Sequence, residues 1–271
     1  MSIKQMRKKL VVKKDNALVA AAYTLNLTEK RMILLASALA NESDPVNGLI
    51  IRADQYAETY SVTKEAGYNA LQEACETLFE RRVTIYKNNE KTVTRWISFI
   101  TYKEGLGEVE IGFSTKVIPF LNELKNNYTF FGIEQIARLT SVHAIRLYEL
   151  LIQWRNIGKT PVIDLAKFRG QLGIGPDEYP RMTNFKQRVL DPALKQINTH
   201  TDLTAKYEQH KRGRKITGFS FTFTQKNAVK TLSKKPKREQ ITRKEAAEKG
   251  RPGEEWNELI KRLSTQYYIK D

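Results

Sequence analysis

The chain has 271 residues, 41% of them hydrophobic, which is enough apolar material for two cores. Lysines and arginines outnumber acids by 46 to 30, so the formal charge of +16 indicates a polyanionic partner, most commonly nucleic acid. The single cysteine excludes an internal disulfide, and no apolar run is long enough for a secretory signal or a membrane span. We therefore expect a cytoplasmic, DNA-associated protein without a membrane partner.

The first half of the chain predicts helices followed by strands. Residues 1–14 hold six basic side chains and no acid, so we expect a basic arm that lies on phosphates or only keeps the chain in solution. The apolar spacing predicts helices from Leu27, with Thr28 as N-cap, and at 53–60, 64–81 and 116–124. β-Branched and aromatic runs predict strands at 83–87, 92–102 and 109–114, the first two joined as a hairpin. These elements define a first domain at 15–125.

The second half repeats this order after an expected connector at 126–140. Helices are predicted at 142–155 with Ser141 as cap, at 165–172 with Asp164 as cap, and at 182–198. Strands are predicted at 203–209 and 216–223, joined by the basic turn KRGRK. Phe219, Phe221 and Phe223 alternate with polar residues, which is the period of a half-buried strand. A second domain at 126–227 follows from these elements.

The remaining residues, 228–271, form a charged segment that is poor in large apolar residues. We expect a mobile basic linker followed by a short amphipathic helix that begins near Trp256. Three helices followed by a two-stranded wing is the order of a winged helix-turn-helix, whose third helix enters the major groove of DNA. The predicted fold class is therefore α+β, with two tandem winged helix-turn-helix domains, a flexible basic linker and a short C-terminal helix.

The third helix of the second domain has an outward face suited to the readout of base edges. Arginine pairs with guanine, and asparagine or glutamine with adenine, in the major groove. The predicted base contacts on this face are Arg181, Asn184, Gln187, Arg188 and Lys195. Phosphate contacts are predicted from the helix and the wing at Lys186, Lys206, His210, Lys211, Arg212, Arg214 and Lys215. The alternative is a solvated amphipathic helix beside a charged hairpin.

Two special residues stand in this region. Gly213 allows the wing loop to turn tightly and to approach the sugar-phosphate backbone. Pro192 lies within the predicted third helix, where it removes a backbone donor. It either kinks the helix or marks a restart with Asp191 as the cap.

The third helix of the first domain differs in charge from its counterpart. Its outward face shows Asn69, Glu73, Glu76 and Glu80. Three carboxylates are repelled by DNA, so we expect this face to meet a protein and mediate assembly. An auxiliary DNA contact is expected instead from the hairpin, through Lys87, Lys91 and Arg95.

The sequence shows no catalytic site. Gly158-Lys159-Thr160 lacks the preceding glycine of a phosphate-binding loop. His143 and Arg146, with Tyr179 downstream, match a tyrosine-recombinase pattern, which leaves a strand-transfer enzyme as a remote alternative. No cysteine or histidine cluster suggests a metal, so we expect a protein that is not an enzyme and has no cofactor and no metal.

Several blocks in the second domain resemble one known family. They are HAIRLYELL at 143–151, LAKFRGQLGI at 165–174, NFKQRVLDPALKQIN at 184–198 and GRKITGFSFTF at 213–223. The first domain adds weaker blocks, LTEKRMILLASALA at 27–40 and YNALQEACETLFERRVTIY at 68–86. The chain thereby resembles the iteron-binding Rep initiators of theta-replicating plasmids, which are built from tandem winged-helix domains.

This resemblance implies a function in DNA replication and plasmid copy control. Such initiators bind direct repeats in double-stranded origin DNA as monomers, help to open the duplex, and help to recruit the host initiator and replicative helicase. As homodimers, formed largely through the first domain, many repress their own promoter at an inverted repeat. The alternative with the same DNA-binding surface is a transcriptional repressor without initiation activity.

Overall fold

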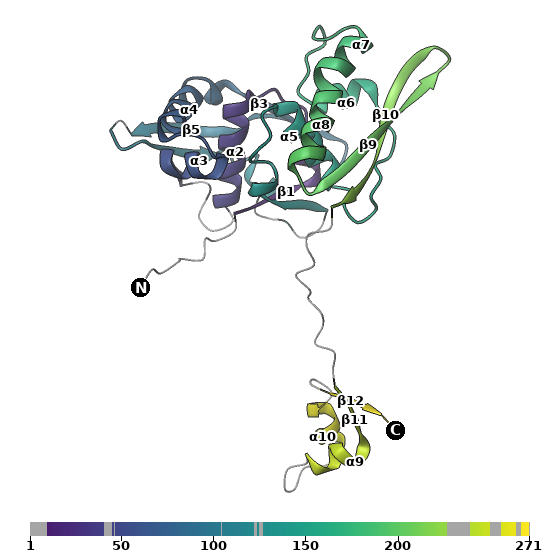
Figure 1. The fold of residues 1–271 in the computed structure, drawn as a ribbon. Helices are drawn as coiled ribbons and strands as arrows, with labels where there is room; N and C mark the ends of the chain where they lie inside the picture. The colour runs from purple at the N-terminus through teal and green to yellow at the C-terminus, as the bar shows by residue number, and fades with distance from the viewer. Residues whose placement is uncertain are drawn as a thin grey trace. The chain divides into compact units, whose positions relative to one another are not determined.

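The computed structural model describes residues 10–40, 45, 47–103, 105–121, 124, 127–226, 239–249, 256–263 and 267–270. Its described residues up to Lys226 form one body, and those from residue 239 onward form a separate unit (Figure 1). No helix within these ranges is long and apolar enough to cross a membrane. The expected basic arm lies outside the described residues as far as residue 9.

The first half of the body contains a helix-turn-helix followed by strands. Its elements are β1 (Val11–Asp15), α1 (Asn16–Val19), α2 (Leu27–Leu39), β2 (Leu49–Arg52), α3 (Ala53–Tyr60), α4 (Lys64–Thr77), η1 (Leu78–Glu80), β3 (Arg82–Lys87), β4 (Glu90–Arg95), β5 (Ile97–Lys103), β6 (Glu108–Phe113) and η2 (Ile118–Phe120). The turn between α3 and α4 uses Ser61 at φ 54°, and Thr63 caps α4 by accepting from the Ala66 amide at 3.1 Å. β2, β6 and β5 form an antiparallel sheet beside these helices.

The segment expected as one strand at 92–102 is two strands. Asn88 and Asn89, at φ 51° and 63°, form the predicted tight turn, so β3 and β4 pair as a hairpin. Trp96 then interrupts the strand, because its fully buried side chain requires a bend. Its amide donates to the Arg81 carbonyl and its carbonyl accepts from the Ser114 amide. β5 consequently pairs with β6, and the β5–β6 hairpin is the wing of this half.

Two local predictions in the first half were wrong. The N-cap of α2 is Asn26 and not Thr28, because Asn26 and Glu29 form a reciprocal capping box with bonds of 2.8 and 2.7 Å. The helix expected at 116–124 is only the single 3₁₀ turn η2, among the residues described there. Pro119 in this turn has no backbone N–H, so it cannot donate the hydrogen bond that would continue a helix.

The second half repeats the helix and wing order. Its elements are β7 (Tyr128–Gly132), η3 (Ile133–Gln135), α5 (Val142–Ile152), β8 (Ile163–Asp164), α6 (Leu165–Gln171), α7 (Met182–Phe185), the π-helical turn η4 (Lys186–Leu190), α8 (Asp191–His200), β9 (Leu203–Arg212) and β10 (Lys215–Gln225). β8, β10 and β9 form a sheet in that order. Asp164 caps α6 as predicted, since its carboxylate accepts from two amides at 2.9 and 3.1 Å.

An aromatic cluster joins the helices of the second half to its wing. Phe219, Phe221 and Phe223 are buried, as their alternation predicts. The ring of Phe168 from α6 lies 5.7 Å from Phe219 and 5.5 Å from Phe221. Phe185 of α7 completes the cluster at 6.2 Å from Phe168, so the third helix is packed on the inner face of the wing.

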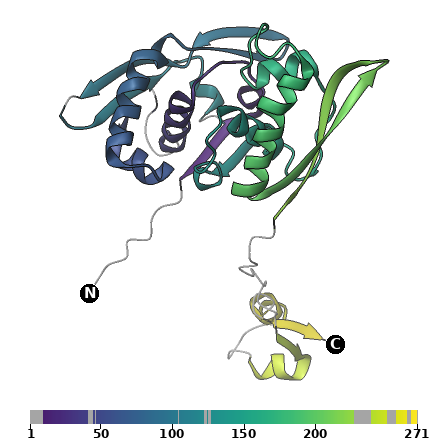
Figure 2. The ribbon, with the colours of Figure 1, turned by 45° about the horizontal axis from the view of Figure 1, so that its top comes forward.

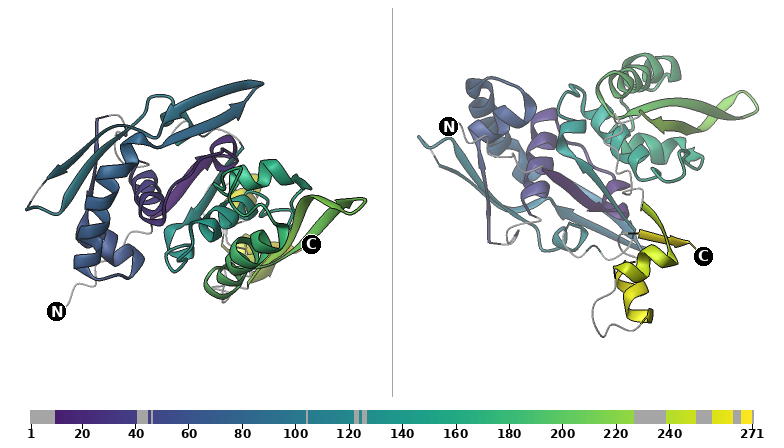
Figure 3. Two further views of the ribbon diagram at one scale, coloured as in Figure 1. Left: turned by 90° about the horizontal axis from the view of Figure 1, so that it is seen from above. Right: turned by 60° about the horizontal axis from the view of Figure 1, so that its bottom comes forward.

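The segment 126–140 is not a plain connector. Its strand β7 pairs antiparallel with β1, so residues 11–14, expected within the basic arm, are part of a two-stranded ribbon. The reason is that Val12 and Phe131 pack into the core on one face of this ribbon. In a mobile arm the apolar side chain of Val12 would stay exposed to water. Seen from above, β1 and α2 lie between the helices of the two halves (Figure 3).

The C-terminal unit contains more structure than a linker. Residues 239–249, expected to be mobile, form β11 (Glu239–Thr242) and α9 (Arg243–Glu248). The predicted amphipathic helix is present as α10 (Trp256–Leu263), and β12 (Tyr267–Lys270) pairs parallel with β11. Burial of Ala246, Leu259 and Leu263 against one another gives this unit a small core of its own, which explains the order. The expected linker at 228–238 lies outside the described residues.

Candidate nucleic-acid interface

The third helix of the second half is one continuous rod with a π-helical turn in its middle. α7, η4 and α8 follow one another without a break from Met182 to His200. Pro192 has no backbone N–H to donate to the helix, and its ring would clash with the carbonyl four residues earlier. The wider π-helical turn directly before it relieves the clash and needs no hydrogen bond from this residue. The alternative of a restart capped by Asp191 was wrong, because Leu190 precedes α8 in helical geometry.

The two sides of this helix differ in chemistry. Phe185, Val189, Leu190, Ala193 and Ile197 are buried against the body. The predicted base-contacting residues lie elsewhere on the helix: Asn184 is half-buried, and the exposed ones are Arg181, Gln187, Arg188 and Lys195. Arginine and amide side chains are thus presented to solvent on a helix whose other side is anchored in a core.

The wing is longer than predicted. β9 and β10 extend as a twisted hairpin that projects beyond the body (Figure 2). Arg212 pairs with Lys215 across a two-residue turn, and Gly213 adopts φ 61°, which glycine tolerates at the first position of such a turn. The basic side chains along this hairpin are exposed: Lys206, Lys211, Arg212, Arg214 and Lys215. The hairpin therefore presents positive charge along its length and at its tip.

Contacts within the protein hold the helix and the wing together. Lys186 donates to the Gln209 side chain at 3.4 Å, and its ammonium lies 5.6 Å from the ring centre of Tyr207. The Tyr207 hydroxyl donates to the Asp191 carboxylate at 2.9 Å. Burial, together with this bond and the charge of Asp191, raises the pKa of Tyr207 to about 12, so the hydroxyl keeps its proton at neutral pH.

His210, a predicted phosphate contact, is also engaged inside the wing. Its Nε2 lies 2.8 Å from the hydroxyl of buried Ser220 on the neighbouring strand. Lys186 and His210 therefore fix the wing in the structure, whereas the other predicted wing residues are exposed to solvent.

The acidic face of α4 and η1 is exposed, but two of its carboxylates have partners. Glu73 accepts from Asn26 and Thr28 at 3.2 and 3.4 Å, and Glu80 pairs with Arg95 at 2.9 Å. Asn69 and Glu76 are exposed on the same helix.

The β3–β4 hairpin holds the predicted auxiliary contacts, which differ in their surroundings. Lys87 pairs with Asp15 at 2.8 Å, and Arg95 pairs with Glu80. Lys91 is exposed beside the turn. Two of these three cations therefore have an acidic neighbour within the protein.

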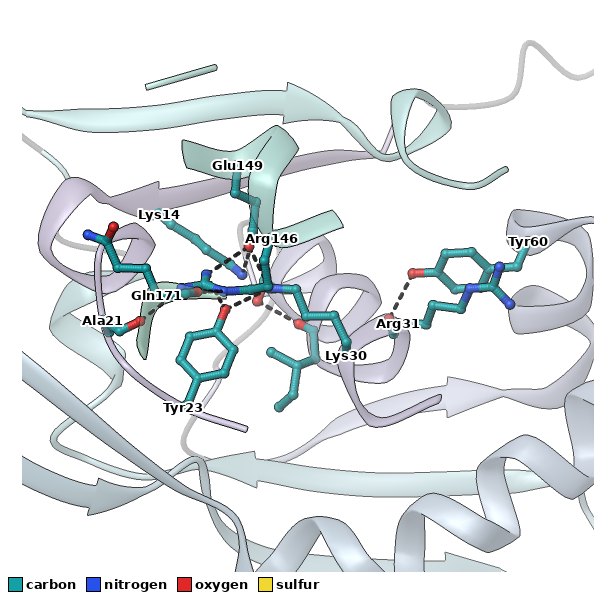
Figure 4. Close-up of polar contacts among 11 residues, drawn as sticks. Lys14, Ala21, Tyr23, Lys30, Arg31, Tyr60, Arg146, Glu149 and Gln171 are labelled. Atoms are coloured by element: carbon teal, nitrogen blue, oxygen red, sulfur yellow. Dashed lines mark hydrogen bonds and ion pairs between the residues drawn. The ribbon is translucent and has the colours of Figure 1, made fainter. Parts of the chain in front are cut away.

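A buried ionic cluster joins the two halves of the body (Figure 4). Glu149 on α5 accepts from Lys14 of β1 at 3.0 Å and from Lys30 of α2 at 2.6 Å. Arg146, one turn earlier on α5, also pairs with Glu149 at 3.0 Å. Its guanidinium lies 4.1 Å from the ring centre of Tyr23 and donates to the tyrosine oxygen. One carboxylate therefore holds three cations that come from both halves.

Burial and charge act in opposite directions on this cluster. Burial alone would raise the pKa of Glu149, but Lys14, Lys30 and Arg146 outweigh it and hold that pKa well below its usual range. Burial lowers the pKa of Lys30, against the opposing effect of Glu149. The cluster was missed by the sequence analysis, although an arginine and a glutamate three residues apart in an apolar helix were its signal.

Two of the residues behind the recombinase alternative, His143 and Arg146, make contacts within the fold. Arg146 is 1% exposed, and it also donates to the carbonyls of Gln171 and Ala21 at 2.7 and 2.8 Å, so it does not reach solvent. His143 lies 3.0 Å from the Leu172 carbonyl. Within the described part of the chain, no group of three or more His, Cys, Asp or Glu side chains could hold a metal ion.

Two helix-turn-helix units, each followed by a β-hairpin, define a protein with two tandem winged-helix domains. The chain belongs to the family of initiator replication proteins. Residues 11–152 match the family's first domain, described as Initiator Replication protein, WH1, and residues 164–223 match the second, Initiator Rep protein, WH2. The first match includes α5, which packs on α8 of the second domain. The same helix carries Glu149, which forms ion pairs with Lys14 of β1 and Lys30 of α2.

Two curated relatives and one solved structure are similar to this chain. An uncharacterised 27.6 kDa protein of Escherichia coli is 28% identical over 219 residues, which cover 75% of this chain and 91% of that protein. A replication initiation protein of Escherichia coli is 27% identical over 216 residues, covering 76% of this chain and 66% of that protein. The fold is shared with the Pi initiator protein, solved in complex with iteron DNA, at a TM-score of 0.66 and 23% identity over 81% of this chain and 99% of that one.

Proposed function

We propose that this protein initiates plasmid replication by binding direct repeats of duplex DNA at an origin. The observation that carries the proposal is the exposed set of arginine and amide side chains on α7, η4 and α8 beside a basic wing. Membership of the initiator family supports the proposal, as does the shared fold with a protein solved on iteron DNA. The formal charge of +16 favours association with a polyanion.

The second winged-helix domain is the main sequence-specific reader in this proposal. Base edges in the major groove are contacted by Arg181, Asn184, Gln187, Arg188 and Lys195. Phosphates are contacted by the exposed wing residues Lys206, Lys211, Arg212, Arg214 and Lys215. Lys186 acts through its contact with Gln209, which holds the wing against the helix, and His210 acts through its contact with Ser220, which joins the two strands of the wing.

The first domain serves assembly in this proposal. The exposed acidic face of α4 and η1 suits a protein partner better than DNA, because phosphates repel carboxylates. Homodimers formed through this domain repress the protein's own promoter, and monomers on the origin help to open it and to recruit the host initiator and helicase. Lys91, exposed on the β3–β4 hairpin, supplies an auxiliary duplex contact.

Transformation separates an initiator from a repressor. The protein is supplied in trans to a plasmid that has no other origin and carries the DNA flanking the gene. An initiator maintains this plasmid, and loss of the plasmid together with intact repression of a reporter would favour a repressor.

Removal of one wing charge tests the phosphate contacts. Arg212→Ala is expected to weaken binding to specific and random duplexes by the same factor, because a phosphate contact carries no sequence information. The slope of log affinity against log salt should fall by about 0.9, the value for one released counterion. Fluorescence anisotropy over a salt series measures both quantities. Lys244→Ala in α9 is the control and should change neither, and a loss confined to one sequence would contradict the assignment of Arg212.

A further inference from the structure

The β1–β7 ribbon has two faces of different chemistry. Its inner face packs Val12 and Phe131 into the core. Its outer face leaves Tyr128 41% exposed and Phe130 49% exposed, at alternate positions of one strand. Folding alone gains little from two aromatic rings held in solvent, so this face indicates a binding surface.

The two rings lie beside each other and beside positive charge. Their centroids are 6.2 Å apart with an angle of 41° between the ring planes. The Arg155 guanidinium lies 5.1 Å from the centre of the Phe130 ring and donates to the Phe130 carbonyl at 3.2 Å. Lys13, exposed, is paired in register with Phe130 on the neighbouring strand. Two cations thus flank a pair of rings on one surface.

Among the described residues of β1 and β7, negative charge is limited. Asp15 is the one acid of the two strands, and its carboxylate is bonded to Lys87 and to the Ala17 amide. Glu134 lies beyond the end of β7, and its carboxylate lies over Gly132. The charge of the surface therefore suits a polyanion.

We propose that Tyr128 and Phe130, with Lys13 and Arg155, bind single-stranded nucleic acid. Unpaired bases stack on exposed aromatic rings, and flanking cations contact the phosphates between them. A duplex cannot use the rings in this way, because its bases are already stacked inside the helix. This site is separate from the duplex surface, since β1 lies at the lower edge of the body in Figure 1 while α7 and the tip of the wing lie at its upper edge. Both nucleic acids can therefore bind at once.

Binding of a labelled oligothymidine tests this site in the full chain. The probe has about 20 nucleotides, longer than the roughly 4–16 that comparable surfaces cover. Fluorescence anisotropy is measured for the wild type and for the double variant Tyr128→Ala, Phe130→Ala. We expect the double variant to bind the single strand roughly tenfold more weakly or worse, because stacking on two rings is lost. Its affinity for random duplex should stay unchanged.

Two further variants make the outcome specific. The exchange Tyr128→Phe, Phe130→Tyr keeps both rings and should retain single-strand binding. Tyr86→Ala removes another exposed tyrosine, on the β3–β4 hairpin, and should have no effect. Oligothymidine binding that is absent in the wild type, or that survives in the double variant, would overturn the proposal. So would an equal loss of duplex and single-strand binding in the double variant. Duplex binding tests the proposed function, and single-strand binding tests this site, so either can fail without the other.

Discussion

Replacing Glu149 by glutamine should lower the free energy of unfolding by about 3–5 kcal/mol, the range for breaking a buried ion pair. The variant keeps the shape of the side chain but leaves Lys14, Lys30 and Arg146 buried together without a counter-charge. Urea unfolding of the full chain, followed by circular dichroism, measures the loss. Glu80→Gln removes the carboxylate of an exposed pair with Arg95, and should cost less than about 1 kcal/mol. An unfolding free energy of the Glu149→Gln variant equal to that of the wild type would contradict the cluster.

The same carboxylate contributes to the pH dependence of stability. The folded-state pKa of Glu149 lies below its value in the unfolded chain, so its contribution is fully present above the ordinary glutamate pKa of about 4.3. That contribution is lost as the pH falls below this value towards the lowered folded pKa. Unfolding free energies measured from neutral pH down to acid should therefore fall less steeply in Glu149→Gln than in the wild type.

Arg188→Ala should weaken binding to the specific duplex by about 1–3 kcal/mol and relax the preference at one base position. Arg188 lies exposed on the π-helical turn, where a guanidinium can pair bidentately with a guanine edge. Competition between specific and random duplexes in an anisotropy assay measures this loss.

A matched variant separates the charge of Arg188 from its geometry. Arg188→Lys keeps the positive charge but loses the planar fork, so specificity should fall while affinity for random duplex is kept. An equal loss on both duplexes for Arg188→Ala would assign this residue to phosphate contact.

Local patterns in the sequence predicted local structure well. The alternation of Phe219, Phe221 and Phe223 predicts the buried face of the wing strand, and the structure confirms it. Asp164 caps its helix as predicted, because the cap depends only on residues within one turn. The apolar spacing of the third helix predicts its inner side, where Phe185, Val189 and Ile197 are buried. In each case the information lies within a few residues.

The sequence could not predict what depends on distant partners. β1 pairs with a strand more than a hundred residues later, and nothing in the pattern of residues 11–14 distinguishes this strand from a basic arm. In the sequence, Lys14 and Lys30 have the appearance of surface charges. Their burial depends on the ion pairs with Glu149, which lies more than a hundred residues later. The π-helical turn depends on how Pro192 is accommodated, and two outcomes were open. The base and phosphate contacts remain predictions, because their test requires DNA.

The two winged-helix domains are packed together in one body. α5 begins the second set of helices, yet it carries Arg146 and Glu149, which bind elements of the first half. Gly173, at φ 77°, lets the end of α6 approach the backbone of Tyr23, where a Cβ would lie 2.7 Å from a carbonyl oxygen. The two winged-helix domains therefore contact each other through buried charges and through close approach of their backbones.

In the proposed function, the outer side of α7, η4 and α8 reads the base sequence of duplex DNA. Selection of bound duplexes from a random library by the full chain, followed by sequencing, tests this role. The wild type should recover one defined motif, and Arg188→Ala should recover the same motif with its preference lost at one base position. Recovery of no motif by the wild type, or of an unaltered motif by the variant, would show that this side of the helix does not read bases.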